Sequence, residues 1–314
     1  MRLALSSVLL ACFWFAVANL AVSAIAWIAA RIAETRERPS AGLLIAIRLM
    51  PAASAIFFAS VLFLPAHWVY EPSGSDEMFG TAMSLLAVLG AALVARGGWR
   101  ALRAVSQDLQ LASLTRQSAT PLDGGAYQVR GVHGVSLAGV LQPRILVGTA
   151  AVEALTAAEL DVAIAHELAH QRSRDNLKRF LMHCAPDLFG WSATARRIEA
   201  RWQAESEREA DARAVRGDER RAVVLASALV KVARLTRRPG AIVPSPAWSA
   251  FHVPTLLEAR VTRLVSGRLE AARGFQPSWR AFAAAALAIP AAVWTFNLSY
   301  SLHLVTEALV SRLP

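Results

Sequence analysis

The sequence predicts an α-helical integral membrane protein of about four spans, with a charged, mainly helical α+β domain and a small β-sheet in its middle. Hydrophobic residues make up 55% of the 314 residues, above the roughly 45–50% usual for soluble proteins. They gather toward both ends of the chain, and the charged residues fill the middle. We therefore expect three spans within residues 1–99, one domain over 100–278, and a fourth span with a short tail over 279–314.

The first apolar run, residues 3–30, contains no charged residue. It is longer than the core of a signal peptide, and it exceeds the ~20 residues that cross a bilayer as a helix. Further apolar runs cover roughly residues 49–70, 78–95 and 281–302, and Pro290 is predicted to kink the last of them.

The placement of arginine predicts the orientation of these spans. The net charge is +10, and the arginines flank apolar runs instead of forming a basic stripe with aromatic residues, so nucleic-acid binding is not expected. Arginines follow the first span (Arg31, Arg36 and Arg38) and the third span (Arg96, Arg100 and Arg103). The loop after the second span contains only acidic charges, which are Glu71, Asp76 and Glu77. The positive-inside rule then places the first loop and the middle domain in the cytoplasm, with both termini outside.

Short strands are predicted between residues 126 and 148, in AYQVRG, VSLAGV and RILVG. Pro143 within this stretch favours an edge position for the strand at 144–148. Thr156 and Glu159 then form a capping box ahead of a helix. Further helices are expected over 194–215, over 219–235 and around Leu257, Val261 and Leu264.

The predicted capped helix contains the segment His166-Glu167-Leu168-Ala169-His170. Histidines four residues apart lie on one helix face, so both imidazoles can reach one Zn²⁺ at about 2.0–2.1 Å. Glu167 is then placed to take a proton from a zinc-bound water. The alternative is a helix with incidental histidines, which the capping box makes less attractive because it independently places the motif in a helix.

A third ligand is expected in the acidic stretch AESEREADARAV, residues 204–215. Glu207 and Asp211 share one helix face, whereas Glu205 and Glu209 point away from it. We therefore expect Glu207 to bind the metal and Asp211 to accept a hydrogen bond from a ligating imidazole. The alternative for this stretch is a solvated charged helix face.

The residues after the motif and the two cysteines each have a simple structural interpretation. Arg174 and Asp175, just after the motif, could brace the ligands or form a local ion pair at the end of the helix. Cys12 and Cys184 occur without a CxxC pattern, which predicts free thiols and no cysteine metal site.

The segments HELAHQRSRDN (166–176) and EREAD (207–211) resemble those of the BlaR/MecR-type antirepressor metallopeptidases. The resemblance extends to GVLQPRILVG (139–148), LTAAELDVAIAHELAH (155–170), RRAVVLASALVKVARL (220–235) and LEARVTRLVSG (257–267). It implies a zinc endopeptidase of the bacterial cytoplasmic membrane, with one Zn²⁺ per chain on His166, His170 and Glu207. It also implies that Glu167 is the catalytic base, and that the substrate is a cytoplasmic repressor or another membrane protein.

The antibiotic-sensing members of that family carry a penicillin-binding domain after the last span. No Ser-x-x-Lys motif follows the last span here, so direct β-lactam sensing is not expected. The alternatives are an HtpX-like quality-control protease and a non-catalytic membrane sensor or scaffold. If the strand at Arg144, Ile145, Leu146 and Val147 is an edge strand, an extended substrate can dock there by strand addition.

Overall fold

The computed structural model describes residues 2–70, 80–132, 134–236, 249–250, 256–267 and 298–312. The chain divides into two compact units. Unit 1 comprises residues 1–98, 185–199 and 275–314, and unit 2 comprises residues 99–184 and 200–274. The expected middle domain, 100–278, thus contains a short segment, 185–199, that packs with the apolar helices.

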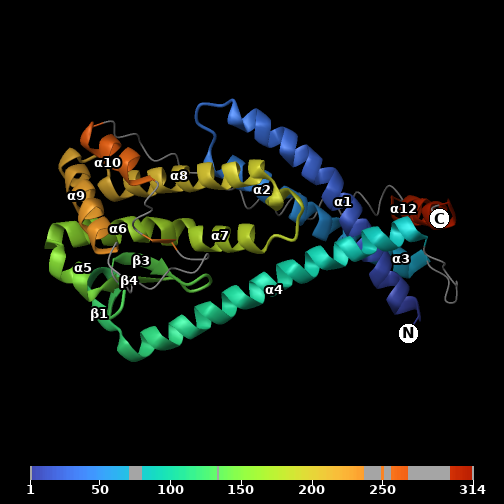
Figure 1. Cartoon of the computed structure of the whole chain (residues 1–314), viewed down its shortest axis with the longest axis horizontal. Helices are drawn as coiled ribbons and strands as arrows, with labels where there is room; N and C mark the ends of the chain where they lie inside the picture. The colour runs from blue at the N-terminus through green and yellow to red at the C-terminus, as the bar shows by residue number, and fades with distance from the viewer. Residues whose placement is uncertain are drawn as a thin grey trace. The chain divides into compact units, whose positions relative to one another are not determined.

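Unit 1 is built from long apolar helices (Figure 1). They are α1 (Arg2–Glu34), a helix from Ala41 to Tyr70, and α4 (Thr81–Ser118). The middle one joins α2 (Ala41–Phe57), a π-helical stretch (Phe58–Phe63) and α3 (Leu64–Tyr70). Segments Ser6–Glu34, Ala41–Tyr70 and Thr81–Gln110 are long and apolar enough to cross a membrane, in agreement with the first three expected spans.

The expected fourth span falls mostly outside the described residues, and so do Pro290 and the acidic loop at 71–77. Its described part, from residue 298 onward, belongs to α12 (Leu298–Arg312). The third span differs from the expectation in its length. The apolar run ends near residue 95, but α4 continues without a break as far as Ser118, because most of residues 99–118 are Ala, Leu, Arg and Gln, which are good helix formers.

The helices of unit 1 contact one another closely. Trp14 on α1 packs beside Phe63, and its indole Nε1 donates a hydrogen bond of 3.1 Å to Thr306 Oγ1 on α12. Gly90 on α4 lies against the backbone of Cys12, where a Cβ would clash with the carbonyl oxygen. Glycine at this position therefore allows α1 and α4 to approach closely.

A buried ion cluster joins α2 to the segment 185–199 within unit 1. Arg48 is 4% exposed, its Nη1 donates to Asp187 Oδ2 at 2.9 Å, and its Nε donates to Glu199 at 2.5 Å. On α1, the buried Asn19 donates to the carbonyl of Pro186 and accepts from the backbone N–H of Leu188. Charges in an apolar setting must be paired, so this cluster holds the segment against the helices.

We predict that Arg48→Met lowers the stability of the protein by about 3–5 kcal/mol, because it leaves the fully buried Asp187 without its cation. Unfolding in detergent micelles measures this loss. Arg31→Met is the matched control, since Arg31 is exposed and pairs with Glu34 three residues away; it should change stability by about 0.5 kcal/mol or less. Equal stabilities of the two variants would contradict the prediction.

Unit 2 contains a mixed sheet with the strand order β1-β2-β4-β3-β5. The strands are β1 (Thr120–Leu122), β2 (Ala126–Val129), β3 (Val135–Ala138), β4 (Arg144–Gly148) and the two-residue β5 (Ser249–Ala250). Strands β2 and β4 pair in parallel, and the other pairs are antiparallel. The strands expected between 126 and 148 are therefore confirmed.

The expected edge position of β4 was wrong. β4 lies inside the sheet, with β2 paired along one side and β3 along the other. Pro143 precedes the strand, so its missing N–H interrupts neither ladder. Ile145, Leu146 and Val147 are buried, and Arg144 is exposed above the ring of Tyr127. No free edge remains at 144–147 for an added substrate strand.

Besides residues 99–118 of α4, six described helices complete unit 2 or extend into it. They are α5 (Thr149–Ala154), α6 (Ala157–Ser173), α7 (Asp175–Cys184), α8 (Ala193–Val215), α9 (Glu219–Thr236) and α10 (Leu257–Val265). One face of the sheet packs on α6, which lies between the sheet and α8 (Figure 1). The core joins residues such as Leu137 and Val147 of the sheet to Val162 of α6 and Leu225 and Leu229 of α9.

Candidate metal centre

Helix α6 places the two histidines. It begins with the expected capping box, in which Thr156 Oγ1 accepts from the Glu159 N–H while the Glu159 carboxylate accepts from the Thr156 N–H. Glu159 also binds Lys231 on α9, which fixes the start of α6 against its neighbour. One apolar face of α6 packs into the core, and His166 and His170, both fully buried, project on the side toward α8.

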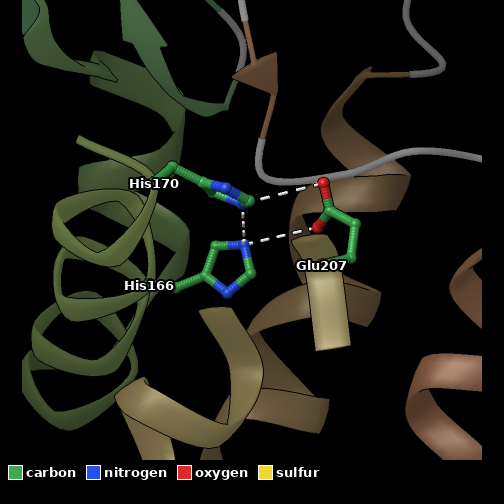
Figure 2. Close-up of side chains that lie close together, drawn as sticks. All are labelled: His166, His170 and Glu207. Atoms are coloured by element: carbon green, nitrogen blue, oxygen red, sulfur yellow. Dashed lines mark hydrogen bonds and ion pairs between the residues drawn. The ribbon is translucent and has the colours of Figure 1, made fainter. Parts of the chain in front are cut away.

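Glu207 on α8 faces both histidines, as Figure 2 shows. The Nε2 atoms of His166 and His170 are 3.1 Å apart. Glu207 Oε2 lies 3.4 Å from His166 Nε2, and Glu207 Oε1 lies 3.7 Å from His170 Nε2. All three side chains are buried, and together they form a group that could hold a metal ion.

The spacing of these atoms fits a small tetrahedral cation. Two ligand atoms about 2.05 Å from one tetrahedral centre lie about 3.3 Å apart, and the three observed separations, 3.1, 3.4 and 3.7 Å, bracket that value. The donor set, two imidazoles and one carboxylate, is one that catalytic zinc sites use. Both Glu207 oxygens are buried without a hydrogen-bond donor in the described part of the chain. The residues present therefore fit zinc.

Each histidine presents its other ring nitrogen to a carboxylate. His166 Nδ1 lies 3.1 Å from Asp211 Oδ1, and His170 Nδ1 lies 2.8 Å from Asp175 Oδ2. A carboxylate beside Nδ1 favours the tautomer with its proton there, which leaves the Nε2 lone pair directed toward the metal position. The position expected for Asp211 agrees with the structure.

Asp175 braces the ligand His170 by accepting hydrogen bonds. Besides His170, its carboxylate accepts from Ser206 on α8 at 2.6 Å and from Lys178 at 2.8 Å. Arg174 does not join the site: it is exposed, and its left-handed backbone (φ 54°) ends α6 and turns the chain into α7. Of the two residues whose roles the sequence left open, Asp175 thus belongs to the site and Arg174 does not.

Glu167 is fully buried next to the first histidine. Neither of its carboxylate oxygens has a hydrogen-bond partner among the described residues. A buried acid without a donor is costly, and no described hydrogen bond compensates for that cost at Glu167. Burial raises the pKa of this carboxyl, although His170 and His166 oppose the shift.

Three arginines that sequence reasoning missed surround the carboxylates. Arg260 Nη1 lies 2.8 Å from Glu207 Oε2, and its Nη2 and Nε donate to Asp211. Arg263 also donates to Asp211, and Arg179 lies 3.6 Å from Glu207 Oε1. The signal for Arg260 was its place beside the apolar stripe Leu257–Val261–Leu264 of α10, which turns it toward the protein interior.

These cations and histidines set the charge of the site. Burial would raise the pKa of Glu207, but Arg260 and His170 outweigh it and hold that pKa well below its usual range. Burial would also raise the pKa of Asp211, but Arg260 and His166 lower it. For His170, burial lowers the pKa, yet Glu207 and Asp175 outweigh burial and raise it to about 10. A metal ion would therefore compete with a proton for this histidine.

Other expected positions lie apart from the metal-binding group. Glu205 pairs with Arg208 and Glu209 pairs with Arg213, as the helix-face reasoning requires. Arg144, Ile145, Leu146 and Val147 belong to the interior strand β4, and none of their side chains joins the group. Cys12 and Cys184 are free cysteines.

We predict that the purified chain binds about one zinc ion, and that His166→Ala, His170→Ala or Glu207→Ala removes most of it, because each change deletes one of three ligands. Metal analysis by mass spectrometry measures the zinc content. Glu205→Ala and Glu209→Ala are matched controls on the same helix and should keep the metal. Full zinc in Glu207→Ala, with a loss in either control, would reject this ligand set.

Comparisons with known proteins neither add to nor restrict this geometric assignment. The sequence matches no protein-family model and no curated protein.

Proposed function

We propose that this chain is a membrane-anchored zinc endopeptidase that cleaves a protein substrate. The observation that carries the proposal is the convergence of the two Nε2 atoms on Glu207, beside the unpartnered carboxylate of Glu167. The three apolar helices support the membrane anchor. The resemblance to BlaR/MecR-type antirepressor metallopeptidases points to the same chemistry.

The groups of the site divide the work of peptide hydrolysis. Zinc, when bound by His166, His170 and Glu207, supplies Lewis-acid activation of water and of the scissile carbonyl. Glu167 takes a proton from the attacking water and delivers it to the leaving amine. Its raised pKa makes the Glu167 carboxylate a stronger base toward the attacking water, while the carboxylic acid that results remains acidic enough to protonate the leaving amine.

Glu167 also separates this proposal from a non-catalytic sensor that keeps the fold. A structural metal site needs ligands and their supporting carboxylates, here Asp211 and Asp175. It does not need a further buried acid that lacks a hydrogen-bond donor, since such a group destabilises the fold. Glu167 has this cost without a structural partner, which favours catalysis.

The placement of arginine and the family resemblance bear on the side of the membrane and on the substrate. The arginines after the first and third spans favour a cytoplasmic peptidase unit in a bacterial inner membrane, with both termini outside. The peptidase unit could then reach a cytoplasmic substrate, and the resemblance implies that this substrate is a transcriptional repressor. A membrane protein is the other candidate, and cleavage of it would fit an HtpX-like quality-control role.

We predict that Glu167→Gln lowers peptide cleavage by about 10²–10⁴-fold, because the amide keeps the size of the side chain but cannot act as a base. Cleavage is followed by mass spectrometry on a proteome-derived peptide library with the full chain in micelles. Zinc content should stay at the parental value, since Glu167 is not a ligand in this scheme. Glu205→Gln, the same change on α8 away from the site, is the control.

Undiminished cleavage by a zinc-loaded Glu167→Gln protein would refute the mechanism. Loss of zinc from that variant would show instead that Glu167 supports the metal site. Absence of zinc-dependent cleavage by the parent would favour the non-catalytic alternative.

The orientation gives a separate prediction. Topology reporters inserted near residues 120 and 240 should be read as cytoplasmic, and one inserted near residue 74 as external, because arginine-rich flanks remain inside. Alkylation of single introduced cysteines in intact cells provides a second readout. An external result at 120 and 240 would exclude a cytoplasmic repressor as substrate.

A further inference from the structure

Arg260 is a buried cation that contacts two carboxylates of the site. Its side chain is 3% exposed. Its Nη2 and Nε donate to Asp211 at 2.6 and 3.1 Å, and its Nη1 lies 2.8 Å from Glu207 Oε2. Glu207 and Asp211 are one turn apart on α8, so one planar guanidinium spans both.

The contacts of Arg260 with the carboxylates of Asp211 and Glu207 differ in kind. Those to Asp211 form a two-point fork of hydrogen bonds. The contact to Glu207 is an ion pair of 2.8 Å, and neither Glu207 oxygen has a hydrogen-bond partner among the described residues. Glu207 is therefore held by charge, while its oxygens remain available to a metal.

Asp211 connects Arg260 to the ligand His166. Its Oδ1 accepts from Arg260 and also lies 3.1 Å from His166 Nδ1. Arg260 thus touches Glu207, and it reaches His166 both through Asp211 and directly, since its Nη2 lies 3.4 Å from His166 Nε2. His170 depends on a separate carboxylate, Asp175.

Helix α10 brings Arg260 to this place. Leu264 is buried in the core against α9, and Leu257 and Val261 pack around it. Because residues 257, 260, 261 and 264 share one helix face, burial of the apolar side chains directs Arg260 inward. Arg263, one turn further along, donates to Asp211 Oδ2 at 2.6 Å. In the described part of the chain, Arg263 forms no ion pair with Glu207, which makes it a natural comparison.

We propose that Arg260 is a positioning residue that presets two of the three metal ligands: Glu207 by direct contact, and His166 by direct contact and through Asp211. This inference rests on the metal site of the proposed function. A guanidinium beside a dication also repels it, so loss of the charge alone would tighten metal binding. Positioning and repulsion therefore predict opposite changes in zinc affinity when Arg260 is removed.

The experiment is a zinc titration of the full chain in micelles against a fluorescent chelator, on the parent, Arg260→Met, Arg260→Lys and Arg263→Met. We expect Arg260→Met to weaken zinc binding by about 10–100-fold, the range typical when a group that orients a ligand is lost. Arg260→Lys should be intermediate, because an ammonium keeps the charge but cannot span both carboxylates. Arg263→Met should stay within about threefold of the parent, since the Arg260 fork on Asp211 remains.

The absorption spectrum of the Co²⁺-loaded protein adds a readout that general destabilisation does not change. The visible bands of Co²⁺ report coordination geometry, so they should shift in Arg260→Met and remain parental in Arg263→Met. If Arg260→Met does not fold, Arg260→Lys decides the question: parental zinc affinity and a parental spectrum in that variant would overturn the proposal.

Tighter zinc binding by Arg260→Met, or equal losses in Arg260→Met and Arg263→Met, would also overturn the positioning role. Failure of the parent to bind zinc or Co²⁺ would reject the metal site itself. These outcomes are distinguishable, because the first two require a parent that binds the metal.

Discussion

The site in unit 2 depends on the requirement that buried charges be compensated. His166, His170, Glu167, Glu207 and Asp211 are each 1% exposed or less, and water cannot stabilise charge there. Each ring nitrogen that does not face the metal position lies beside a carboxylate, and Asp211 is bound by two arginines. Only Glu167 and Glu207 keep oxygens without a hydrogen-bond donor in the described chain. These oxygens belong to one metal ligand and to the residue that follows another ligand in the sequence, and a dication held by the ligands would complete the charge balance.

Much of the site could be predicted because helical geometry is local. A spacing of four residues puts His166 and His170 on one face, and the same period selects Glu207 and Asp211 over Glu205 and Glu209. The capping box at Thr156 was readable for the same reason: its two hydrogen bonds join residues three apart. Each of these inferences needed only the backbone of one helix, and the meeting of α6 with α8 then followed from the preference of zinc for three protein ligands.

The errors and omissions concern contacts between segments distant in the sequence. Pro143 suggests an edge strand, but strand order depends on which strands pair, and β2 pairs with β4 in parallel from 19 residues upstream, as Ala126 and Ile145 illustrate. Arg260 was missed because an arginine on a short amphipathic helix is usually solvated; its burial depends on partners 49 and 53 residues away. Asp175 remained undecided because the left-handed turn at Arg174, which returns the chain toward His170, leaves no clear mark in the sequence.

The same requirement for charge compensation connects metal binding to the stability of unit 2. Without a metal, the ligand group contains the carboxylate of Glu207, which arginines hold, and His170, whose pKa Glu207 raises. A proton on His170 can then supply part of the positive charge that a metal ion would bring. A metal ion held by His166, His170 and Glu207 would replace that proton and would supply the partner that the Glu207 oxygens lack. Ligands on α6 and α8, and the arginine of α10 that braces them, come from three helices that are also held by apolar packing and by polar contacts such as that of Arg213 with Ser173. Metal binding would add a link between α6 and α8 at the ligands, and the free energy of binding would appear as resistance of these helices to separation.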